Sequence, residues 1–372
     1  MALYKTLVKK VSISPEKKTK QKDYLPKGQL PIIDQGQQLI GGYSDNLDMQ
    51  LACNLPVIVF GDHTRAVKYV DFPFGAGADG IKVLEPAAGI YPKFLYYATQ
   101  YLVLRLEDRG YARHYQYIEK KELDIPSIPE QKRIVARIEE LFSELDNGVE
   151  TLRKTKQQLA VYRQAVLKDA FSHITEKKTI REMSSVVTSG SRGWAQYYSD
   201  HGAKFVRIGN LTRDRIRIDL SDIQFVDLPD DAEGKRTQLQ PNDVLVSITA
   251  DLGSIGLVPD DIREAYVNQH IAMVRFLNPV QGEFMAWYLR SDYGQKDLLK
   301  NKRGGGKLGL GLDDIRDSRV PVVSDAEAIK IVENIEARLS VCDSIEKTVD
   351  TALQQAEAMR QSILKQAFEG RI

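Results

Sequence analysis

The chain has 372 residues, a formal net charge of +1 and two cysteines with no CxxC spacing. This length predicts two or more domains, and the balanced charge excludes a protein that is basic over its whole surface. No apolar run approaches the ~20 residues of a membrane helix, and the scattered cysteines and histidines argue against a disulfide scaffold or a metal site, so a cytoplasmic, non-membrane protein is expected.

Residues 1–27 form the most basic stretch, with eight lysines against one Asp and one Glu. Two interpretations fit this composition. The segment is either an arm that faces nucleic acid or a solubilising, partly mobile terminus.

The first block, residues 1–124, predicts short strands at 55–60, 68–72 and 81–85, followed by a helix from Tyr91 to Leu106. Loop residues of this block are candidates for contact with DNA because they carry charge and aromatic rings beside glycines. They are His63 and Arg65 in FGDHTR, and Arg113, His114 and Tyr115 in GYARHYQYI.

A long amphipathic helix is predicted from Glu130 to Phe171. A row of apolar residues seven apart predicts its interface with a partner helix: Ile138, Leu145, Leu152, Leu159 and Val166. A companion row is expected at Ile134, Leu141, Gly148, Thr155 and Tyr162. Ser127 and Glu130 form an S-x-x-E capping box, and the heptad keeps its register across Gly148.

The second block, residues 175–319, predicts strands at 204–208, 215–220, 243–248 and 271–276, then a helix from Phe284 to Lys300. The aromatic residues of this helix and of the helix at 91–106 are interpreted as core. If 215–220 is a strand, Arg213, Arg215 and Arg217 share one face, where they either contact DNA or pair with Asp on an exposed surface. Lys302, Arg303 and Lys307 flank Gly304–Gly306 and are further DNA-binding candidates.

The helical segment is repeated near the C-terminus. Glu130–Phe171 and Glu327–Phe368 are identical at 16 of 42 ungapped positions, 197 residues apart. The second copy has its own capping box at Ser324 and Glu327, and its interface row is Ile335, Cys342, Val349, Ala356 and Ile363, with Cys342 read as a buried apolar residue. Its companion row is Ile331, Arg338, Ile345, Ala352 and Met359.

This duplication predicts a pseudo-two-fold α+β fold, in which two α/β domains are separated by two long helices that form an antiparallel coiled coil. An intermolecular coiled coil in a homodimer is the alternative. The expected domain boundaries are 1–126 and 175–322 for the two blocks, 127–174 for the central helical region and 323–372 for the C-terminal one.

Enzyme motifs are missing from the sequence. There is no GxxxxGK[ST] phosphate loop and no [DN]PP[YF] site for an extruded adenine. FGAGA at 74–78 does not join a clear strand to a helix, and PDDAEGK at 229–235 crowds its carboxylates into one turn. No catalytic residue and no metal ligand is predicted.

The sequence resembles the specificity (S) subunits of type I restriction–modification enzymes. The resemblance rests on the segments IPSIPEQKRIVARIEELFSELD and YRQAVLKDAF, and on the C-terminal MRQSILKQAFEGRI. PVIVFGDHTR, GADG and GYARHY also resemble one type of target recognition domain in that family, and NQHIAMVRF resembles a family segment of the second domain.

The resemblance implies a non-catalytic DNA-binding subunit. Each of its two target recognition domains would read one half of a split, asymmetric site in double-stranded DNA. The helices would space the domains and dock two modification subunits, which use S-adenosylmethionine to methylate adenine. Restriction subunits would supply ATP- and Mg²⁺-dependent translocation and cleavage. The alternatives are a solitary DNA methyltransferase, or a coiled-coil DNA-binding adaptor or regulator without a methylation partner.

Overall fold

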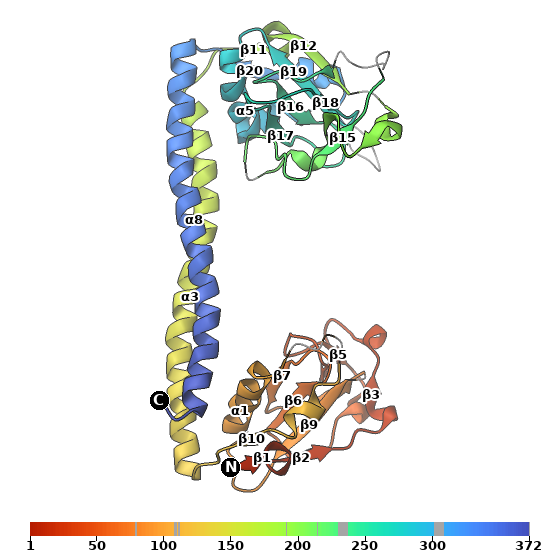
Figure 1. Cartoon of the computed structure of the whole chain (residues 1–372), viewed down its shortest axis with the longest axis vertical. Coiled ribbons are helices and arrows are strands. Elements are labelled where there is room, and N and C mark those ends of the chain that lie inside the picture. The colour runs from red at the N-terminus through yellow and green to blue at the C-terminus, as the bar shows by residue number, and fades with distance from the viewer. Residues whose placement is uncertain are drawn as a thin grey trace. The chain divides into compact units, whose positions relative to one another are not determined.

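The computed structural model describes residues 1–78, 80–107, 110, 112–190, 192–213, 215–229, 237–300 and 309–371. They form two compact units. Unit 1 comprises Met1–Arg153 and Asp350–Ile372, and unit 2 comprises Lys154–Val349. Each unit combines a β-rich body with part of both long helices, α3 (Ile128–Phe171) and α8 (Asp325–Phe368) (Figure 1).

Both long helices begin and end where the repeat predicts. Each starts directly after its serine, and the Glu327 backbone N–H donates to Ser324 Oγ at 3.3 Å, which supplies one half of the predicted capping box. Helix α3 is continuous across Gly148. The chain therefore pairs its own two helices in antiparallel fashion, as the intramolecular interpretation expects.

Within each unit the two helices pack along the predicted apolar row. Ile138, Leu159, Val166, Ile335, Cys342 and Val349 are buried, and Leu145, Leu152, Ala356 and Ile363 are half-buried. The predicted companion row is wrong at Gly148, Tyr162, Ile345 and Met359, which are exposed. The second inward row begins instead at Val135 on α3 and at Val332 on α8.

This inward row is partly charged, and its charges pair between the helices. In unit 2, Arg163 Nη2 lies 2.6 Å from Asp343 Oδ1 and 2.9 Å from Glu346 Oε2. In unit 1, Arg360 pairs with Asp146. A search for apolar residues at heptad spacing misses this row, because several of its members are charged and pair with opposite charges on the other helix.

The part of unit 1 that the structure describes contains ten strands. The strands are β1 (Ala2–Leu3), β2 (Val8–Val11), β3 (Lys18–Thr19), β4 (Leu30–Ile33), β5 (Gly42–Ser44), β6 (Val57–Gly61), β7 (Val67–Val70), β8 (Gly75–Gly77), β9 (Ile81–Pro86) and β10 (Glu122–Leu123), among the described residues. Two four-stranded sheets have the orders β2-β9-β6-β7 and β3-β8-β4-β5, and β1 pairs with β10. Helices α1 (Pro92–Leu104) and α2 (Tyr115–Ile118) follow the sheets.

Unit 2 repeats this plan. Its strands, among the residues described, are β11 (Lys177–Thr179), β12 (Ser184–Ser189), β13 (Tyr198–Ser199), β14 (Ala203–Val206), β15 (Gln224–Val226), β16 (Val244–Ser247), β17 (Ile255–Leu257), β18 (Ala265–Val267), β19 (Ile271–Phe276) and β20 (Arg319–Pro321). Its sheets have the orders β12-β19-β16-β17 and β13-β15-β14-β18, and β11 pairs with β20. Its shorter helices are α4 (Ile180–Met183), α5 (Gly282–Arg290), α6 (Asp292–Leu298) and α7 (Leu312–Arg316).

The two bodies are therefore divergent copies of one module. The order β2-β9-β6-β7 matches β12-β19-β16-β17, and the parallel pair β4·β8 matches β14·β18. They differ in one short strand. In unit 1 β3 pairs with β8, whereas in unit 2 β13 pairs with β15 at the other edge of its sheet.

The helix that follows the sheets packs its aromatic residues against the end of a long helix. In unit 1 Phe368 of α8 contacts the rings of Phe94 and Tyr101, both at 5.2 Å between centroids. In unit 2 Phe171 of α3 contacts Phe284 and Tyr288 at 5.6 and 5.4 Å. These aromatics are core residues, as predicted, and each module is held on its helix pair by them.

Two expectations about local structure are wrong, and one of the two interpretations of residues 1–27 is not observed. Residues 215–220 are not a strand among the described residues. They show only an isolated bridge from Arg217 to Leu257, although Ile216 and Ile218 are buried and the arginines exposed. The helix predicted at 284–300 divides at Ser291, whose buried hydroxyl caps α6. Residues 1–27 are folded onto unit 1 rather than forming a mobile terminus. No described helix is both long and apolar enough to cross a membrane.

The contact between the short helix of each module and the long helix differs in charge between the two units. In unit 1 Lys93 Nζ lies 2.6 Å from Glu139 Oε1. In unit 2 Glu283 faces Glu336, the repeat equivalent of Glu139, and Arg217 Nη2 lies 2.9 Å from Glu283 Oε1. Burial, with the hydrogen bond to Glu336, raises the pKa of Glu283 to about 7, although Arg217 opposes this.

Unit 2 should therefore lose stability as the pH rises. The folded state holds a proton on Glu283 between its ordinary pKa of 4.5 and about 7, whereas the unfolded state releases it. The free energy of unfolding should fall by about 1–2 kcal/mol across this window, allowing for partial exposure. Denaturation at pH 5 and pH 8 measures it, and Glu283→Gln should flatten the profile. A wild-type profile already flat would contradict the prediction.

Candidate nucleic-acid interface

The turn between β6 and β7, residues 62–66, carries two of the predicted contact residues. His63 and Arg65 are half-buried, and Arg65 has a positive φ of 62°. The backbone N–H of Arg65 donates to Gly61 O at 2.9 Å, which closes the turn. Both residues therefore lie at the end of a buried central strand, as the sequence predicts.

Asp62 joins this turn to the segment that carries the other candidates. Its carbonyl accepts from the His114 N–H at 2.8 Å, and its carboxylate Oδ1 accepts from the Tyr115 N–H at 2.9 Å. His114 and Tyr115 are buried, whereas Arg113 is exposed. The structure thus brings the two predicted groups together, and it favours Arg113 over His114 and Tyr115 as a surface contact.

The lysine segment, residues 17–27, lies on a neighbouring sheet of the same unit. Lys18–Thr19 forms β3 and pairs in parallel with β8. Close packing needs glycine here, because a Cβ at Gly77 would lie 2.5 Å from the hydroxyl of Tyr24. FGAGA is therefore a tightly packed strand. Four lysines of this segment are exposed: Lys17, Lys20, Lys22 and Lys27.

Unit 2 has an equivalent backbone hydrogen bond between its loop end and its own turn, residues 248–254, which joins β16 to β17. The Leu310 N–H donates to Ile248 O at 3.0 Å, as the His114 N–H donates to Asp62 O in unit 1. Thr249 also bridges to Gly309. The predicted residues Lys302, Arg303 and Lys307 lie outside the described residues, as does most of PDDAEGK. Residues 309–310 nevertheless place the end of that loop beside the turn.

The arginine triplet is exposed, and each member has an acidic partner. Arg213 Nη2 lies 2.6 Å from Asp251 Oδ1 in the turn of unit 2. Arg215 Nη2 lies 3.7 Å from Asp219, and Arg217 pairs with Glu283. The alternative of an exposed face with acidic partners therefore describes this arrangement. Arg213 is the member that lies at the turn.

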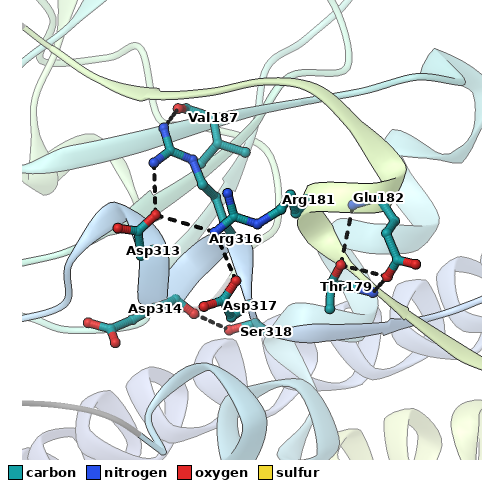
Figure 2. Close-up of polar contacts among 9 residues, drawn as sticks. All are labelled: Thr179, Arg181, Glu182, Val187, Asp313, Asp314, Arg316, Asp317 and Ser318. Atoms are coloured by element: carbon teal, nitrogen blue, oxygen red, sulfur yellow. Dashed lines mark hydrogen bonds and ion pairs between the residues drawn. The ribbon is translucent and has the colours of Figure 1, made fainter.

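Ion pairs hold α7, which follows the predicted basic loop, against the start of the module (Figure 2). Arg316 Nη2 donates to Val187 O at 2.8 Å, and its Nη1 lies 3.0 Å from Asp313. Arg181 of α4 reaches Asp317 at 2.9 Å and Asp313 at 3.4 Å. These pairs hold α7, the helix into which the predicted basic loop leads, in a fixed position.

Sequence reasoning missed three polar residues: His270 and Lys82, which contact the turns, and Asn268, which lies between β18 and β19. His270 Nδ1 lies 2.9 Å from Thr249 Oγ1, and Asn268 lines a polar pocket of about 410 Å³ with Arg207. Lys82 Nζ lies 3.4 Å from Asp62 Oδ2. His270 and Asn268 stand in NQHIAMVRF, so that motif was the available signal. Within the described ranges no group of three or more His, Cys, Asp or Glu is placed to hold a metal ion.

Comparison with known proteins finds specificity subunits of type I restriction enzymes. The chain is 26% identical over 284 residues to that of EcoBI from Escherichia coli, 24% over 269 residues to that of EcoKI from E. coli strain K12, and 25% over 274 residues to that of StySPI from Salmonella potsdam. Each match covers 67% of this chain. The chain spans 57–58% of the length of these curated relatives. No protein-family model matches.

Solved structures share the fold. A structure of a type I restriction–modification system matches with a TM-score of 0.73 at 14% identity, and covers 100% of this chain and 97% of the other. The HsdS subunit from Thermoanaerobacter tengcongensis matches with a TM-score of 0.58 at 14% identity, with 100% and 96% coverage. These likenesses bear on the arrangement of sheets and helices, not on the bases that are read.

Proposed function

We propose that this chain, which belongs to the family of type I restriction–modification specificity subunits, is the non-catalytic subunit that selects a bipartite DNA site for methylation. Unit 1 reads one half and unit 2 the other. The observation that carries this proposal is the repeated turn: in both modules the turn after the central strand is bonded to the end of a Gly-bearing basic loop. Two modules with different loops suit an asymmetric site.

Charge on the two modules supports binding to double-stranded DNA. Arg113 and the lysine segment of unit 1 are exposed and basic, and the arginine triplet of unit 2 is exposed. Phosphate contacts provide affinity, whereas contacts to base edges provide sequence preference. The lysines suit the first role. Arg65, Arg113 and Arg213 lie at the turns and suit the second, because arginine binds guanine in a bidentate manner.

Exposed apolar residues on the helices support docking of two partner subunits. Tyr162 on α3 and Met359 on α8 occupy equivalent positions in the repeat and are 43% and 54% exposed. Val341 and Ile345 of α8 are also exposed. We assign these related surfaces to two modification subunits. In this proposal S-adenosylmethionine binds those subunits, while ATP and Mg²⁺ serve restriction subunits in the cytoplasm.

Reconstitution with the cognate modification subunits tests the function. The complex should methylate adenines at one split sequence, as read by methylome sequencing, and the chain alone should turn over no S-adenosylmethionine. Arg113→Ala should relax one half only, with a cost of about 1–3 kcal/mol if Arg113 reads a base. Methylation without a bipartite motif, or turnover by the isolated chain, would overturn the proposal.

A further inference from the structure

We infer that Asp62 is a positioning residue for the DNA-reading surface of unit 1. This inference rests on the proposed function. Asp62 is 3% exposed, so it cannot itself contact DNA. It acts through the turn that carries His63 and Arg65, and through the segment that carries Arg113.

Four contacts fix Asp62 to two other segments of the module. Its N–H donates to Gly80 O at 2.6 Å, at the start of β9. Its carbonyl and carboxylate accept from the successive N–H groups of His114 and Tyr115. Lys82 of β9 lies 3.4 Å from Oδ2 and balances the buried charge. The turn, the strand and the loop end are thus joined at one residue, through its backbone and its carboxylate.

The carboxylate contact is specific to unit 1. Unit 2 retains the backbone bond, from the Leu310 N–H to Ile248 O, but has an apolar residue where Asp62 stands. There, the next N–H, that of Gly311, donates to Asp314 Oδ2 of α7 itself at 2.7 Å. The turn of unit 2 is braced by Asp251 instead, which accepts from Ser254 Oγ at 2.6 Å. Among the described residues, which leave out 301–308 of the unit 2 loop, a side chain couples turn to loop in unit 1 alone.

Replacement of Asp62 should consequently loosen the register between Arg65 and Arg113. The backbone bond from His114 remains, so the fold is retained, but the Tyr115 N–H loses its acceptor and Lys82 its partner. Selectivity at one half-site should fall, because two contacts to adjacent bases need a fixed mutual position. Selectivity at the other half should be unchanged.

The experiment uses the full chain in complex with its modification subunits and reads the methylome. Asp62→Ala should lower discrimination about 10-fold or more at one half-site, the half that Arg113→Ala also relaxes. Asp62→Asn keeps an acceptor for the Tyr115 N–H and should restore most of it. The double variant Asp62→Ala/Lys82→Met leaves no unpaired charge and should relax the same half, which covers the case in which Asp62→Ala assembles poorly.

Val59→Ala is the matched control, because Val59 is buried in β6, the strand that leads into the turn, and its register partners are Lys68 of β7 and Val83 of β9. It should lower thermal stability while both half-sites stay selective. Unchanged selectivity in both Asp62→Ala and Asp62→Ala/Lys82→Met, relaxation of both halves, or equal relaxation by Val59→Ala would overturn the inference. A wild-type complex that methylates no bipartite site would instead refute the proposed function.

Discussion

Asp243→Ala is expected to destabilise unit 2 by about 3–5 kcal/mol, because it leaves a largely buried arginine without its carboxylate partner. Asp243 is 1% exposed, and Arg275 bonds it through two nitrogens, Nε to Oδ1 at 2.8 Å and Nη2 to Oδ2 at 2.7 Å. The carboxylate also accepts from the Gln240 N–H at 2.8 Å. The pair therefore holds the segment before β16 against β19.

Intrinsic fluorescence is well suited to this measurement. The two tryptophans of the chain, Trp194 and Trp287, are both buried in unit 2, so their emission follows unfolding of that unit alone. Asp243→Ala should lower the denaturant concentration at the midpoint of unit 2 unfolding. A paired variant, Asp243→Ala/Arg275→Leu, removes both charges and should recover most of the loss. A shift below about 1 kcal/mol for Asp243→Ala would show that the pair contributes little.

The long helices were predictable because their evidence is local and repeated. The heptad rows and the serines before Ile128 and Asp325 define their limits, and α3 and α8 begin and end accordingly. The strands at β6 and β19 were predictable for a similar reason, because each is a continuous apolar run bounded by turn residues. Such patterns depend on neighbours in sequence.

Small and charged residues limited the rest of the prediction. β8 consists of Gly-Ala-Gly, and nothing in its composition favours a strand. Tyr24, which stands far away in sequence, makes glycine necessary at Gly77. The second inward row of the helices contains Arg163 and Glu346, which are half-buried only because they face each other. Pairing across 183 positions leaves no periodic signal.

The candidate site was predictable in its types of residue but not in its arrangement. Arg65 and Arg113 follow from turn and loop chemistry, yet nothing local indicates that they share a surface. Asp62 brings them together across 53 positions through a hydrogen bond to backbone, which any residue at position 115 except proline would supply. The burial of His114 likewise follows from the fold and not from its polar flanks.

Paired insertions of seven residues should lengthen the gap between the half-sites while preserving both halves. Helices α3 and α8 each run from one unit into the other, and the units divide between Arg153 and Lys154 and between Val349 and Asp350. Duplicating residues 154–160 and 350–356 at these two points keeps each apolar row in phase. Seven residues add about 10 Å of helix at 1.5 Å per residue.

The expected change is up to about three base pairs of gap, because DNA advances about 3.4 Å per base pair. No residue of either β-rich body changes, so the two half-site sequences should stay the same. Paired insertions of five residues are the control. They turn each helix by about 140° at 3.6 residues per turn, whereas seven residues misplace the row by only about 20°. The five-residue variant should therefore fail to assemble.

Methylome sequencing of the complex distinguishes the outcomes. A longer gap with unchanged halves would support helices that set the spacing. An active seven-residue variant with the original gap would mean that the modification subunits or the DNA set it, and the helices would then serve for docking alone. The seven-residue variant keeps its methylation activity only if the docking surfaces for the modification subunits stay intact. Tyr162 and Met359 lie outside the junctions, so each stays with its own unit and both modification subunits should still bind.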